Sequence, residues 1–130
     1  MLYKGIIKRI IVFSCVFLCF FDSYSQTRIK AMFYNVLFYS DEDEDNQRTP
    51  HLKNILDEIA PDLFMVCELE DEAGSNYLFN NAVLPHNPDF LKANYQTTRS
   101  SISLNQMVYY NKKKLILESQ SVIGTNSFRT

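Results

Sequence analysis

The sequence has no tryptophan and few glycines, prolines and cysteines, with three, four and three respectively. So little Gly and Pro excludes collagen-like and proline-rich chains. The sequence has 13 Lys and Arg and 15 Asp and Glu, so it has no excess of positive charge. The charge balance therefore does not indicate nonspecific nucleic-acid binding. What is present is a globular composition, with 46% hydrophobic residues, eight Tyr and ten Phe. A length of 130 residues allows one domain.

The amino-terminal residues have the pattern of a secretory signal peptide. Met1–Arg9 carries three basic residues, and Ile10–Phe21 is apolar except for one serine. Twelve residues are too few for a bilayer, which needs about 20. Small residues stand at −3 and −1 of a junction between Ser25 and Gln26, so we expect cleavage there and a secreted or periplasmic chain. An uncleaved membrane anchor is the alternative, and a lipoprotein using Cys15 or Cys19 is less favoured.

Removal of residues 1–25 changes what the composition implies. The 105 residues that are left carry 10 basic and 14 acidic residues, a net charge of −4. Cys67 is then the single cysteine, which excludes an intramolecular disulfide. Its apolar surroundings favour a buried, inert thiol. We therefore expect an apolar core, with no stable membrane span after cleavage and no disulfide partner.

A strand, a helix and a second strand form the most informative part of the sequence. Arg28–Tyr39 and Asp62–Leu69 have apolar residues at both alternating positions, which predicts strands covered on both faces. Ser40–Asn46 contains five consecutive acidic residues and predicts a solvated loop rather than a calcium loop. Thr49-Pro50 is typical of a helix start, and an apolar stripe at helical spacing follows until Pro61.

The rest of the chain gives weaker signals. We expect His51 to have a solvent-facing or packing role rather than a catalytic one, and His86 to be an ordinary loop histidine. The expected elements are a helix over Ser75–Val83, a turn over Pro85–Asp89, a strand over Phe90–Thr97, and a hairpin of Leu104–Asn111 and Leu115–Ile123 joined by Lys112–Lys114.

Two polar residues interrupt the apolar strands near their carboxyl ends. A helical crossover normally returns the chain parallel to the first strand, so Asn35 and Glu68 are expected at the same edge of the sheet. An amide oxygen beside a carboxylate offers the hard ligands that Mg²⁺ prefers. From the residues alone, a structural Asn and a surface Glu remain open as alternatives.

These segments resemble the opening of the endonuclease/exonuclease/phosphatase superfamily, whose members are metal-dependent phosphoesterases similar to DNase I. The resemblance rests on Phe33–Val36, then Pro61–Glu68 after a helix, with Arg48 ahead of that helix and Met107–Asn111 as a later strand. It spans Thr27 to Thr130.

The resemblance implies an α/β fold in which two sheets form a sandwich with outer helices. Glu68 would match the family's Mg²⁺ ligand, and Asn35 would match the Asn of its metal and phosphate site. Asp62 would fix the start of its strand, while Arg48 would serve structure or approach phosphate. The substrate would be a phosphate ester, with nucleic acid among the options but mildly disfavoured by the net charge of −4.

The family's second half is not matched. Its Asp-x-Asn segment and its terminal Asp and His would lie beyond Thr130, so no catalytic residue is assigned and the substrate-binding residues stay unknown. The sequence therefore predicts residues 26–130 to be the amino-terminal half of a secreted phosphoesterase, a fragment inactive alone. The alternative is a small extracytoplasmic binding or interaction domain without catalysis.

Overall fold

The computed structural model describes residues 27–97 and 104–121, which form a mixed four-stranded sheet in the order β1-β2-β4-β3. Its strands are β1 (Ala31–Tyr39), β2 (Leu63–Leu69), β3 (Phe90–Lys92) and β4 (Asn105–Asn111). As predicted, β1 and β2 are parallel. β4 is antiparallel to both β2 and β3, two pairings that were not predicted. The expected signal peptide, residues 98–103 and the end of the expected hairpin lie outside the described residues.

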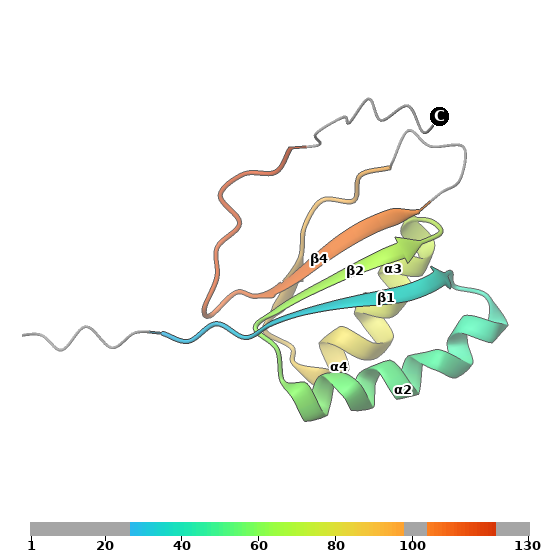
Figure 1. The fold of residues 1–130 in the computed structure, drawn as a ribbon, viewed down its shortest axis with the longest axis horizontal. Helices are drawn as coiled ribbons and strands as arrows, with labels where there is room; N and C mark the ends of the chain where they lie inside the picture. Colours follow the sequence, from blue (N-terminus) through green and yellow to red (C-terminus); the bar gives the residue numbers. More distant parts are fainter. Residues whose placement is uncertain (1–26, 98–103, 122–130) are drawn as a thin grey trace, which may run out of the picture.

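Helices cover one face of this sheet (Figure 1). They are α2 (Asp43–Ile59), which connects β1 to β2, and a continuous helical segment made of α3 (Glu72–Leu78), a π-helix η1 (Phe79–Val83) and α4 (Leu84–His86). The core lies between the helices and the sheet. Its members are buried apolar side chains: Met32, Val36, Tyr39, Leu52, Leu56, Phe64, Val66, Leu69, Leu78, Ala82, Val83, Phe90, Met107 and Tyr109.

Two helix predictions need correction at their ends. α2 begins at Asp43, so part of the acidic segment expected to be a loop is helical, and Pro50 lies inside the helix. Thr49 does not cap the helix, because it is buried and its hydroxyl hydrogen-bonds the Tyr39 hydroxyl. The helix expected over Ser75–Val83 extends from Glu72 to His86, so Pro85 and His86 are helical rather than part of a turn.

The carboxyl-terminal strands also differ from expectation. The expected Phe90–Thr97 strand is reduced to β3, with one further bridge between Gln96 and Gln106. Residues 112–114 form the predicted turn, but residues 115–121 form no strand. The reason is topological, because β4 already pairs with β2 along one edge and with β3 along the other.

β1 was expected to be covered on both faces, and that prediction is wrong within the described residues. β1 is an edge strand, and Phe33, on the face away from the helices, is 63% exposed. The same face of the central strand β2 is half-buried, including Cys67, which was expected to be buried. Burial still raises the pKa of the Cys67 thiol, and nearby Glu68 adds to the effect, in keeping with a poorly reactive group.

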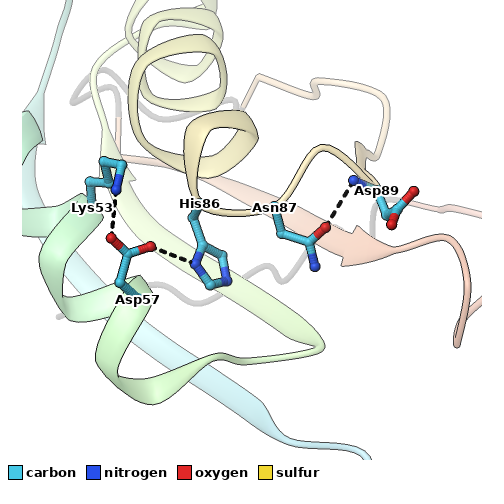
Figure 2. A network of polar contacts seen from close by, with 5 residues as sticks. All are labelled: Lys53, Asp57, His86, Asn87 and Asp89. Atoms are coloured by element: carbon cyan, nitrogen blue, oxygen red, sulfur yellow. Dashed lines mark hydrogen bonds and ion pairs between the residues drawn. The ribbon is translucent and has the colours of Figure 1, made fainter.

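A polar network joins α2 to α4 (Figure 2). The Asp57 carboxylate accepts from Lys53 at 2.5 Å and contacts His86 Nδ1 at 2.9 Å. The contact with Lys53, then that with His86, lowers the pKa of the Asp57 carboxyl. His86 also lies edge-on to the Phe90 ring, with centroids 6.0 Å apart. The prediction of an ordinary loop histidine is therefore wrong, because His86 lies in a helix and contacts both Asp57 and Phe90.

Candidate metal site at the carboxyl ends of the parallel strands

The parallel pairing of β1 and β2 brings the two predicted ligand positions together. Asn35 is in register with Cys67, the residue before Glu68. Neighbouring strands lie about 4.8 Å apart, so the backbones of Asn35 and Glu68 are close neighbours at one edge of the sheet.

Both strands are irregular at this point. Glu68 has a φ of 63°, and Leu37 and Phe38 have φ values of 50° and 52°. Such left-handed backbone is uncommon for residues other than glycine. The pairing register shifts between Asn35 and Tyr39 on β1 and between Cys67 and Leu69 on β2, which marks a β-bulge in each strand. Bulges of this kind often re-aim a side chain next to a functional site.

The bulge in β2 explains how a carboxylate sits between core residues. Cys67 pairs with Gln106 and Leu69 pairs with Asn105, so two residue steps on β2 match one step on β4. Regular alternation would put Glu68 on the face covered by the helices, where an unpaired carboxylate is costly. Because of the extra residue, Leu69 lies on the face covered by the helices, where it is fully buried. Glu68 is only half-buried.

The bulge in β1 is held by two side chains. Asn35 Oδ1 accepts a hydrogen bond from the Leu37 N–H at 2.8 Å. Arg48 Nη1 donates to the carbonyl oxygens of Val36 and Leu37 at 2.8 and 3.0 Å, and its guanidinium lies 5.4 Å from the centre of the Tyr39 ring. These contacts support the structural interpretation of Arg48, which lies within α2 rather than ahead of it.

The Glu68 carboxylate makes no hydrogen bond or ion pair within residues 27–97 and 104–121. A half-buried carboxylate without such a partner is poorly stabilised by the protein, and a cation would compensate for it. Asn35 Oδ1 uses one of its two lone pairs on Leu37, which leaves the second for a ligand. The donor set is therefore one carboxylate and one amide oxygen.

This donor set fits a weakly held Mg²⁺. Mg²⁺ is commonly bound through one or two carboxylates and keeps several waters. No group of three or more His, Cys, Asp or Glu side chains lies within metal-binding reach in the described part of the chain. A zinc-type site is thus not formed by these residues, and a site that uses only Asn35 and Glu68 would leave most ligand positions to water.

A cavity of about 310 Å³ lies beside Asn35, between β1 and α2. Its walls are mostly apolar, and sequence reasoning did not predict it. The helical spacing of Leu52 and Ile55 was visible in the sequence. The cavity between α2 and β1 also depends on where the β1 bulge places the strand, which the sequence does not show. The lining residues are Tyr34, Asn35, Val36, Leu37, Arg48, His51, Leu52 and Ile55.

Asp62 has the structural role that was predicted for it. Its Oδ2 accepts from the Lys30 N–H at 3.0 Å, and its Oδ1 lies 2.8 Å from Lys114 Nζ. Its own N–H donates to the Lys30 carbonyl, and its carbonyl accepts from the Asn111 N–H. Asp62 therefore ties the starts of β1 and β2 to the end of β4, far from the edge that carries Asn35 and Glu68.

The two histidines lie outside the candidate site. His51 is exposed on α2 at the lining of the cavity, and His86 in α4 contacts Asp57 near the carboxyl-terminal end of α2. Neither histidine contacts Glu68. That neither histidine is catalytic stays a prediction.

Comparison of the chain with protein-family models, with curated proteins and with solved structures found no match. Among the helices of the described residues, none is long and apolar enough to cross a membrane.

Proposed function

We propose that this chain forms part of the active centre of an exported, divalent-metal-dependent phosphoesterase, with Glu68 and Asn35 as ligands of a Mg²⁺ ion. The observation that carries the proposal is the juxtaposition of Asn35 and Glu68 on bulges of two parallel strands. Polar residues at the carboxyl ends of parallel strands are the usual place for ligand sites in α/β sheets.

Three further features support the same function. The carboxylate of Glu68 has no cation among the described residues, and Asn35 keeps a free lone pair. The strained backbone at Leu37, Phe38 and Glu68 is of the kind that gathers at functional sites. The sandwich of two sheets that the resemblance implies also needs a sheet with one face free of helices, and the helices of the described residues all lie on one face of β1-β2-β4-β3.

When bound, the metal would polarise a phosphoryl oxygen of a phosphate ester and stabilise the charge that develops on hydrolysis. In this chain, Glu68 would hold the ion. Asn35 and the β1 bulge that Arg48 supports would fix the position of the ion. No general base lies beside Glu68 in the described residues, so we propose that the chain alone binds metal without turnover.

Metal binding by the purified chain tests this proposal. Titration with Mn²⁺, followed by electron paramagnetic resonance of the free ion, should show one site. Glu68→Gln removes the charged ligand and should weaken binding at least tenfold, whereas Glu58→Gln, on the exposed side of α2, should leave it unchanged. Equal binding by both variants would contradict the role of Glu68.

Turnover is measured separately. The chain with Mg²⁺ and bis(p-nitrophenyl) phosphate should release no nitrophenol above the buffer rate. Robust hydrolysis that Glu68→Ala abolishes would show that the chain is catalytic alone and would overturn that part of the proposal.

A second candidate function, an extracytoplasmic interaction domain, is favoured by the exposed apolar face of the sheet. It predicts no specific metal binding, so the Mn²⁺ titration distinguishes the two.

A further inference from the structure

The cavity between β1 and α2 shares a residue with the proposed metal site. Asn35, whose amide oxygen is a proposed Mg²⁺ ligand, is also one of the residues that line the cavity. The volume of about 310 Å³ is at the lower end of the range for small-molecule sites, which is about 300–1,000 Å³. An apolar cavity of about 150 Å³ already takes up a benzene molecule. The space beside Asn35 therefore admits a group of the size of an aromatic ring or a short alkyl chain.

Two hydrogen bonds show which end of the cavity lies nearest the metal site. Arg48 Nη1 donates to the Val36 carbonyl oxygen at the carboxyl end of β1. Lys30 Nζ, just before β1 begins, donates to the Ile59 carbonyl oxygen at 2.6 Å. α2 therefore runs back along β1 in the opposite direction (Figure 1). Because a helix rises about 1.5 Å per residue, Ile55 lies about 10 Å farther along α2 than Arg48, away from the metal-site end.

The walls of the cavity change in character along this direction. Asn35 and Arg48 are the polar lining residues at the carboxyl end of β1. Leu52 and Ile55, farther along α2, are apolar, the first a member of the core and the second packed against it. His51 lies on the same stretch of α2, but it is exposed. A ligand that matches these walls has a polar group at the Asn35 end and an apolar group directed toward Ile55.

We propose that the cavity receives the ester group of the substrate, so that the substrate is a phosphate ester of a compact apolar alcohol or phenol. This binding mode depends on the proposed function, because the metal ion beside Asn35 would hold the phosphate. Each CH₂ group buried in the cavity strengthens binding about fourfold. A sugar hydroxyl in the same place would lose its hydrogen bonds to water. The cavity therefore favours aryl and alkyl phosphates over nucleotides, in which the phosphate is bonded to a polar sugar.

Different ester groups on the same phosphate test this binding mode. The purified chain, saturated with Mg²⁺, is titrated with phenyl phosphate, methyl phosphate or thymidine 5′-phosphate, and nuclear magnetic resonance follows the backbone amide of Leu37. The contact between phosphate and metal is common to the three ligands, so the ratio of their dissociation constants reports the ester group alone. We expect phenyl phosphate to bind at least tenfold more tightly than either of the other two.

Variants of α2 show whether the preference arises in the cavity. Ile55→Trp fills the apolar end of the cavity and should abolish the preference for phenyl phosphate. Ile55→Asn makes that end polar and should have the same effect, which keeps the test decisive if the larger side chain prevents folding. Ile59→Trp, on the same helix but outside the lining and 36% exposed, is the control and should keep the full preference.

Metal binding and ester preference are measured separately, so the two proposals can fail separately. Equal affinity for phenyl and methyl phosphate, or no detectable binding of either, overturns this binding mode even where Mn²⁺ binding depends on Glu68. In that case the proposed metal site stands. A preference that both Ile55 variants leave unchanged also overturns it, because the phenyl group then lies outside the cavity. If Glu68→Gln leaves Mn²⁺ binding unchanged, the proposed function fails, and this binding mode fails with it.

Discussion

Replacing Asp62 with asparagine tests how the three strands of the sheet are held together at their common end. The Asp62 side chain is 9% exposed and accepts from both the Lys30 N–H and Lys114. Asp62→Asn preserves the shape of the side chain and removes its charge. Its new NH₂ group would face the Lys114 ammonium, which is also a donor, so that contact is lost rather than weakened.

The expected cost follows from the two contacts. A hydrogen bond to a charged group contributes about 1.5–3 kcal/mol against about 0.5–1.5 for a neutral one, so the Lys30 contact loses about 1 kcal/mol. Lys114 is 42% exposed, and solvent screening limits that ion pair to about 0.5–1 kcal/mol. The free energy of unfolding should fall by about 2 kcal/mol, which lowers the Tm of a domain of this size by about 10 °C.

Urea denaturation followed by circular dichroism, at one fixed protein concentration, measures this loss. The Lys114 ion pair, followed by the Lys30 hydrogen bond, lowers the pKa of the Asp62 carboxyl in the folded chain. The stabilisation is therefore complete above the unfolded pKa of about 3.9 and disappears as the pH falls through the lower folded value. The difference between wild type and Asp62→Asn should narrow below about pH 4. A difference below 0.5 kcal/mol at pH 7, or one that persists unchanged at pH 2, would refute the reasoning.

Two substitutions on the helix side of the sheet give further predictions. Gly74→Ala should lower the free energy of unfolding by about 2–3 kcal/mol, because a Cβ there would lie 2.8 Å from both Ser40 Cα and the Tyr39 carbonyl oxygen. Thermal unfolding should show a loss well above the ~1 kcal/mol expected for the control Ala73→Gly. Equal losses for the two variants would contradict the close packing at Gly74. Tyr109→Phe should cost about 1–3 kcal/mol, since it leaves the buried Ser75 hydroxyl and carbonyl without the Tyr109 hydroxyl at 3.2 and 3.0 Å. Urea titration against a Tyr34→Phe control checks it, and matching midpoints would argue against the hydrogen bonds.

The strand-helix-strand unit was predictable because several local signals agree there. The apolar content of β1 and β2, the helical spacing of Leu52 and Leu56, and Pro61 after the helix all indicate the same order of elements. Parallel pairing followed from the length of the crossover. The candidate ligands Asn35 and Glu68 could be placed at one edge for the same reason.

The bulges could not be predicted, because local sequence does not favour them. Leu37, Phe38 and Glu68 adopt left-handed backbone that their residue types disfavour, so tertiary packing decides it. Burial of Tyr39 and Leu69 in the core, with both side chains at 0% exposure, fixes the register beyond each bulge.

The start of α2 was misread for a related reason. Thr49-Pro50 is typical of a helix start, but the hydroxyl of Thr49 contacts Tyr39. Acidic residues are also favoured near helix amino termini, and this effect applies to Asp41–Asp45, where the sequence prediction rested only on their mutual repulsion. The second strand of the expected hairpin does not form because β3 occupies the remaining edge of β4. This is a long-range pairing, which local sequence does not reveal.

The two edges of the sheet bear on how the chain associates at high concentration. Exposed edge strands offer unpaired N–H and C=O groups to other chains and are a common origin of fibrils. Here one edge is β3, only three residues long, and the other is β1, interrupted by its bulge after Asn35. Neither offers a long, regular template for strand addition. Association of this domain by strand addition into an open-ended filament should therefore be disfavoured.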